Sequence, residues 1–165
     1  MSEKCCDTGC PISSSFGLLV LRLVVGASLA MHGWSKFKEP ARSGFFENVS
    51  HMDAPFESHP KIFGWASVAA ELGGGILIAL GGLTRLAAFA LACNFAVAVW
   101  KVHLHHDPYI NPGGHAMEPA VIYGAISVAL MFLGAGRFSI DAMLFGGRRK
   151  KDEELSPPDE PIEKF

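Results

Sequence analysis

The sequence predicts an all-α integral membrane protein, a four-helix bundle with both termini on the cytoplasmic side. Half of its 165 residues are hydrophobic and 18% are charged, whereas soluble domains carry about 25% charged residues. Four apolar stretches account for this bias. Each is about 20 residues long, the length of helix that crosses the hydrocarbon core of a bilayer. The net charge of −2 excludes a nucleic-acid binder that relies on net charge. Because of the four apolar stretches, membrane lipid is the expected partner.

The four stretches run from Phe16 to Trp34, Ile62 to Leu83, Thr84 to Leu104 and Glu118 to Gly136. A soluble four-helix bundle is the alternative, but its helices need a polar stripe at helical spacing because one face meets water. The run from Leu86 to Val99 lacks such a stripe, and Asn94 is its only strongly polar residue. A cleaved signal peptide is disfavoured, because the residues before the first stretch lack a basic start and Arg22 interrupts its apolar core.

The distribution of charge divides the chain into three parts. Residues 1–13 form a polar leader with three cysteines, 14–146 the membrane domain, and 147–165 a charged tail that we expect to be disordered. More Lys and Arg residues fall on the side that holds both termini, among them the basic run 148–151. The positive-inside rule therefore places both termini in the cytoplasm, with the protein in the cell (inner) membrane.

The connections between the spans have their own signals. A short interfacial helix over Ala41–Val49 is expected in the first outer loop. Gly81 and Gly82 predict a tight inner turn, and Thr84 is a candidate cap for the helix that follows. All three tryptophans fall near the outer ends of spans, where aromatic residues gather at membrane interfaces.

Three segments in order carry a family resemblance. The first span contains LRLVVG at residues 21–26 and HGWSKF at 32–37, the second contains ELGGG at 71–75 followed by LGGLTRLA at 80–87, and the last ends in GAGRFSID at 134–141. In these segments the chain resembles the DoxX family of small four-span integral membrane proteins, over roughly residues 16–141.

The resemblance implies a membrane subunit of a quinone-linked or thiol/sulfur-linked oxidoreductase system, since family members are associated with a thiosulfate:quinone oxidoreductase and with thiol and oxidative-stress systems. The redox cofactors would then belong mostly to other membrane or peripheral redox subunits, and the sequence has no covalent haem or iron–sulfur motif. Quinone is the candidate ligand. The alternative is a non-catalytic accessory subunit that anchors or stabilises a larger respiratory-type membrane complex.

Three polar residues fall inside predicted spans. Counted at 1.5 Å per residue from the cytoplasmic ends, Arg22 lies about 9–12 Å deep, Asn94 about 15 Å and Glu71 about 18 Å. Charged residues at such depth normally face the bundle and pair with one another. One interpretation is a polar pocket or proton path centred on Glu71. The other is a structural Arg22–Glu71 ion pair, unless Arg22 extends to the cytoplasmic face instead.

A second set of polar residues lies at the outer ends of the spans. His32, Lys36, Lys101 and Glu118 fall within about two helical turns of the same interface, where they are candidates for a quinone headgroup site or a proton exit. The alternative is that both lysines extend to the interface and His32 bonds to the outer loop.

All seven histidines fall on the outer side, and His103, His105 and His106 are weak candidates for a metal site. Their spacing matches no defined metal signature, and solvated loop histidines are the default interpretation.

Cysteines add little to the functional assignment. Cys5, Cys6 and Cys10 lie in the leader, where a cytoplasmic location disfavours a disulfide. They are either reactive thiols on a flexible terminus or ligands of a soft metal that lacks a fourth partner. Cys93 in the third span is expected to be a small packing residue.

The predicted topology can be tested by labelling in intact cells. A cysteine introduced at His105 should react with a membrane-impermeant thiol reagent, whereas Cys5 should react only after the cells are permeabilised. The opposite labelling pattern would reverse the orientation.

Overall fold

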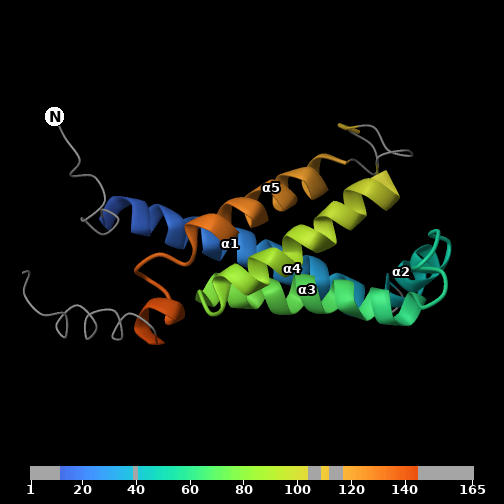
Figure 1. The fold of residues 1–165 in the computed structure, drawn as a ribbon, viewed down its shortest axis with the longest axis horizontal. Coiled ribbons are helices and arrows are strands. Elements are labelled where there is room, and N and C mark those ends of the chain that lie inside the picture. The colour runs from blue at the N-terminus through green and yellow to red at the C-terminus, as the bar shows by residue number, and fades with distance from the viewer. Residues whose placement is uncertain (1–11, 39–40, 104–108, 112–116, 145–165) are drawn as a thin grey trace, which may run out of the picture.

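Residues 12–38, 41–103, 109–111 and 117–144 are described by the computed structural model, and within these ranges all regular secondary structure is helical. The elements are α1 (Ile12–Phe37), α2 (Ala41–Ser50), α3 (Pro60–Leu80), α4 (Thr84–Val97), the π-helical segment η1 (Ala98–His103) and α5 (Glu118–Leu133). Helices α1, α3, α4 and α5 run along the long axis of the molecule, and α2 covers one end (Figure 1). We call this the α2 end, and the opposite end, which holds the α3–α4 connection, the turn end.

Among the described residues, three helical segments are long and apolar enough to cross a membrane: Ser14–Phe37, Pro60–Leu80 and Thr84–Val102. Helix α5 is also apolar but has only 16 residues. It was expected to reach Gly136, but Gly134 takes a left-handed φ of 74° and ends the helix after Leu133. The second predicted span is likewise shorter than expected, because Gly81 ends α3 with a left-handed φ of 72°.

Large apolar side chains cover the outside of these helices. Met31 of α1, Leu86 of α4 and Phe132 of α5 are 72%, 64% and 72% exposed. In water such a surface would drive aggregation, whereas lipid solvates it without cost. The exposed apolar faces therefore argue against the soluble-bundle alternative.

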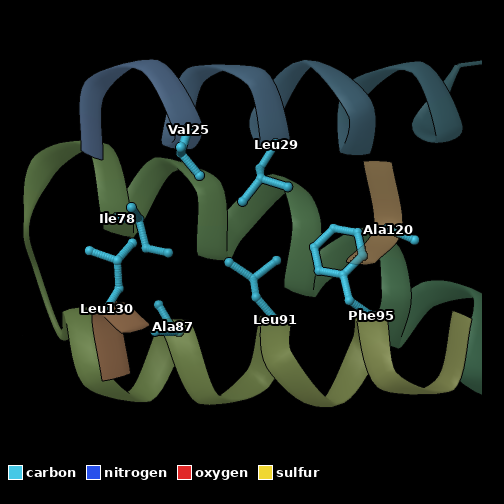
Figure 2. Close-up of a cluster of buried hydrophobic side chains, with 9 residues drawn as sticks. Val25, Leu29, Ile78, Ala87, Leu91, Phe95, Ala120 and Leu130 are labelled. Carbon is cyan, nitrogen blue, oxygen red and sulfur yellow. The ribbon is translucent and has the colours of Figure 1, made fainter. Parts of the chain in front are cut away.

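The buried core lies where α1, α3, α4 and α5 converge. Leu29, Ile78, Leu91 and Leu130 come from these four helices in turn and are 0% exposed. Figure 2 shows Leu29 and Leu91 pointing toward one another across the core, with Ile78 beside Leu130. The core is mostly aliphatic, with Phe95 of α4 as its one aromatic member among the described buried residues.

Helices α1 and α3 are in backbone contact. A Cβ added at Gly75 would lie 2.6 Å from the backbone nitrogen of Ala30, and one at Gly33 would collide with the backbone nitrogen of Leu72. A Cβ at Gly26 would meet Ala79 at 2.6 Å. Small residues allow this approach, as is common between helices in membranes. The three contacts also fix α1 and α3 as antiparallel in one register.

At the turn end the chain after α5 folds back over the α3–α4 connection. The backbone N–H of Asp141 donates to the carbonyl oxygen of Gly81 at 2.9 Å. The Asp141 carboxylate accepts hydrogen bonds from the backbone N–H groups of Leu83 at 2.7 Å and Thr84 at 2.9 Å. Thr84 was the expected cap, but its hydroxyl has no hydrogen-bond partner in the described part of the chain. The cap of α4 is therefore Asp141.

The backbone contact between α1 and α3 predicts opposite outcomes for two neighbouring glycines. Gly75→Ala should lower the free energy of unfolding by about 1–3 kcal/mol, because the new methyl group meets backbone atoms that cannot rotate away. Gly73→Ala is the matched control: nothing lies within 4 Å of a Cβ at this position, so stability should be unchanged or slightly higher. Unfolding in detergent measures both, and equal effects would contradict the proposed packing.

Candidate functional site

Three polar side chains from three helices meet near the α2 end. Glu71 of α3 is 3% exposed. Its Oε1 accepts a hydrogen bond from Lys36 Nζ of α1 at 2.6 Å and another from Asn94 Nδ2 of α4 at 2.9 Å. We call Lys36, Glu71 and Asn94 the polar triad. A buried carboxylate is costly unless it is paired and hydrogen-bonded, and the polar triad meets both conditions at one oxygen.

The register of α1 on α3 explains why Lys36 is the partner. Gly33 lies on Leu72, so Lys36, one turn further along the same face of α1, reaches the neighbouring Glu71. The Lys36 ammonium also lies 4.8 Å from the ring centroid of Phe45 in α2, within the range of a cation–π interaction. Lys36 thus connects α1, α2 and α3 at one point.

Only one oxygen of the Glu71 carboxylate is satisfied. Oε2 is buried and has no hydrogen-bond partner among the described residues. A buried acceptor without a partner costs about 1–3 kcal/mol, and more when it is charged. This oxygen is therefore a point at which a ligand hydrogen bond would be favourable.

The polar triad lines a cavity of about 550 Å³. Helix α2 and the turn after it supply large apolar walls, Phe45, Val49, Met52 and Phe56. Helices α3 and α4 supply mostly small side chains, Ala66, Ser67, Ala70, Ala90 and Cys93. Ala66, Ala90 and Cys93 are exposed, so the cavity opens along the groove between α3 and α4. It is a largely apolar space with one polar wall.

The expected Arg22–Glu71 ion pair is not formed. Arg22 is 0% exposed, and its guanidinium donates to the carbonyl oxygen of Phe138 at the turn end. It packs directly on Gly81, where an added Cβ would collide with Nη1. The fourteen residues from Arg22 to Lys36 correspond to about 21 Å along α1. Depths counted from the ends of each span missed this separation, because the register of α1 on α3 places Arg22 at the α3–α4 turn.

Of the four residues expected to form an outer site, only Lys36 belongs to the polar triad. His32 faces α5: its Nδ1 lies 3.0 Å from the carbonyl oxygen of Ser28, and its ring meets Tyr123 edge-on with centroids 5.8 Å apart. The Tyr123 hydroxyl in turn is 2.6 Å from Ser28 Oγ. His32 thus helps to join α1 to α5.

Lys101 and Glu118 are also separate from Lys36. Lys101 Nζ lies 3.7 Å from the exposed Asp53 carboxylate and 4.8 Å from the centroid of the Trp100 ring. Glu118 occupies the first turn of α5, where its charge complements the helix dipole. No hydrogen bond or ion pair among the described residues joins His32, Lys101 or Glu118 to Lys36.

The metal and cysteine candidates are only partly covered. Within the described ranges, no group of three His, Cys, Asp or Glu side chains could hold a metal ion. His105 and His106 lie outside those ranges, as do Cys5, Cys6 and Cys10, and the position of the His103 side chain is not described. Cys93 is exposed and lines the cavity, so it is not the buried packing residue that the sequence suggested.

The fold and the exposed apolar helices define a class, the multi-pass membrane proteins. Within that class the chain belongs to the DoxX family, whose pattern matches residues 17–104, from α1 to the residue after η1. Two relatives come from Haemophilus influenzae, and each is described only as an uncharacterized protein. One is 31% identical over 133 residues, covering 78% of this chain and 90% of the relative. The other is 26% identical over 134 residues, covering 81% and 86%. No solved structure matches the chain.

The partner of Glu71 can be tested by double-mutant cycles. Lys36→Met and Glu71→Gln should be non-additive, with a coupling of about 1–3 kcal/mol in the free energy of unfolding, because they remove the same ion pair. Arg22→Met and Glu71→Gln should be additive within about 0.5 kcal/mol, because the two sites are well separated. Denaturation in mixed detergent micelles, followed by circular dichroism, gives both values. If only the Arg22 cycle shows coupling, Glu71 pairs with Arg22, as expected from the sequence, and not with Lys36.

Proposed function

We propose that this protein is the membrane subunit of a quinone-linked oxidoreductase system and binds quinone in the cavity beside the polar triad. In this proposal it is a four-span bundle of the inner membrane with both termini in the cytoplasm. The observation that carries the proposal is the combination of a largely apolar cavity with one polar wall made of Lys36, Glu71 and Asn94.

The dimensions and chemistry of the cavity fit such a ligand. Small-molecule sites commonly enclose about 300–1,000 Å³, with mostly apolar walls and a few well-placed polar groups. The Lys36 ammonium can donate to a quinone carbonyl while it stays paired with Glu71. The aliphatic tail would follow the groove of small side chains between α3 and α4 toward the lipid.

The reaction chemistry is proposed to be shared with partners. Reducing a quinone to a quinol takes up two electrons and two protons. The electrons would come from a membrane or peripheral redox subunit, in keeping with the thiol- and sulfur-linked systems that the family resemblance implies. The Glu71 carboxylate and the Lys36 ammonium are the two titratable groups of the polar triad. The protons would reach the quinone oxygens beside these two groups.

Binding can be measured through a cysteine already present in the cavity wall. Decylubiquinone should slow the alkylation of Cys93 by N-ethylmaleimide in detergent-purified protein, because the ligand covers the thiol. Lys36→Met should weaken this protection about tenfold or more, the expected effect of losing a hydrogen bond from a charged group. Peptide mass spectrometry separates Cys93 from the other cysteines.

Arg85→Gln is the control. Arg85 lines a second cavity, of about 590 Å³, at the turn end, so protection of Cys93 should be unchanged in this variant. Lys36→Arg, which keeps the cation, controls for a folding defect. Absence of protection in the wild-type protein would reject the quinone site and favour the accessory-subunit alternative, which then predicts stable co-purification with a larger complex.

A further inference from the structure

The hydrogen bonds of the polar triad are unevenly distributed over the Glu71 carboxylate. Oε1 accepts from both Lys36 and Asn94, whereas Oε2 accepts from no described residue. The side chain is 3% exposed and lines the cavity. An ionised carboxylate oxygen can only accept a hydrogen bond. Glu71 Oε2 therefore lacks a hydrogen-bond donor, because Lys36 and Asn94 both donate to Oε1.

The net charge of the cavity wall narrows the ligand class further. Lys36 and Glu71 are the only charged residues that line it in the described part of the chain, and their charges cancel. A permanently charged ligand would lose its hydration in this apolar space without gaining a counter-charge. A neutral molecule with a hydroxyl group fits the wall better.

We infer that the cavity selects the reduced quinol over the oxidised quinone, a specificity that rests on the proposed quinone site. A quinol hydroxyl can donate to Glu71 Oε2. A quinone carries carbonyl acceptors at the same positions, so that two acceptors would face each other there. The selectivity comes from a hydrogen bond that one redox form makes and the other leaves unmade, the kind of difference that gives large discrimination in polar sites.

This preference changes the redox properties of the bound ligand. When the reduced form binds more tightly, the bound couple has a higher midpoint potential than the free couple. For a two-electron couple, each tenfold preference corresponds to about 30 mV. Bound quinone would thus be a stronger electron acceptor for the partner subunit.

Three matched ligands test the inference on the purified wild-type protein without oxygen. Decylubiquinol should bind at least tenfold more tightly than decylubiquinone, and also than the dimethyl ether of decylubiquinol, which keeps the shape of the quinol but has no donor. The rings are fully substituted, so the quinone cannot add to the Cys93 thiol. Isothermal titration in detergent micelles gives the three affinities.

Glu71→Gln tests the residue itself. Its amide N–H₂ can donate to a carbonyl, so the quinol preference should disappear or invert. Glu118→Gln makes the same chemical change at a residue outside the cavity wall, and should leave the preference intact. Equal binding of quinol and quinone by wild-type protein would overturn the selectivity and leave the quinone site standing. Binding of none of the three ligands would reject both.

Discussion

The close contact between α1 and α3 is the constraint on which the rest of the structure depends. Gly33 on Leu72 and Gly75 on Ala30 leave no room for a methyl group between the two backbones. A contact between backbones fixes both the distance and the register of two helices, because neither side can adapt by changing a rotamer. That register brings Lys36 to Glu71 at one end of the molecule and Arg22 to Gly81 at the other. The positions of the buried charges are therefore consequences of glycine placement.

The two ends satisfy their buried charges in different ways. At the turn end, Arg22 donates to a backbone carbonyl of the segment that folds back after α5, and Asp141 in that segment caps α4. Arg22 and Asp141, which lie in segments that carry the family resemblance, thus have a structural role at the turn end. At the α2 end, Glu71 is paired at one oxygen and lines a cavity. Arg22 and Thr84 also carry buried polar atoms without a described partner, but neither residue lines the cavity at the turn end. Glu71 differs from both because its unpartnered oxygen belongs to a side chain that lines a cavity, and this is why the proposed ligand is placed at the α2 end.

The sequence predicted the helices well because hydrophobic length is a local property. The ends of α3 and α5 were misplaced by a few residues, since the stop depends on which glycine adopts a left-handed conformation. The α4 cap escaped prediction because Asp141 is 57 residues from Thr84. Glu71 and Asn94 were expected in one polar group together with Arg22, whereas Lys36 was assigned to the separate outer site. Their grouping depends on the register of α1 and α3, which depth counting cannot supply. The cavity itself has no sequence signature, because Phe45 and Cys93 look like ordinary apolar residues.

The cavity follows from an unequal length of helices at the α2 end. Helix α1 stops at Phe37, opposite the middle of α3, whereas α3 continues for about two more turns to Pro60. Helix α2 covers this extension and contacts it through Phe46, which packs on Gly64 so closely that an added Cβ would collide with the ring. The side chains of α2 close the space above α3 and α4 without filling it, because the facing residues are mostly alanines. Lys36 lies in the last turn of α1, and its ammonium pairs with Glu71 just before the chain passes to α2. The end of α1 therefore determines where the Lys36–Glu71 ion pair meets the cavity.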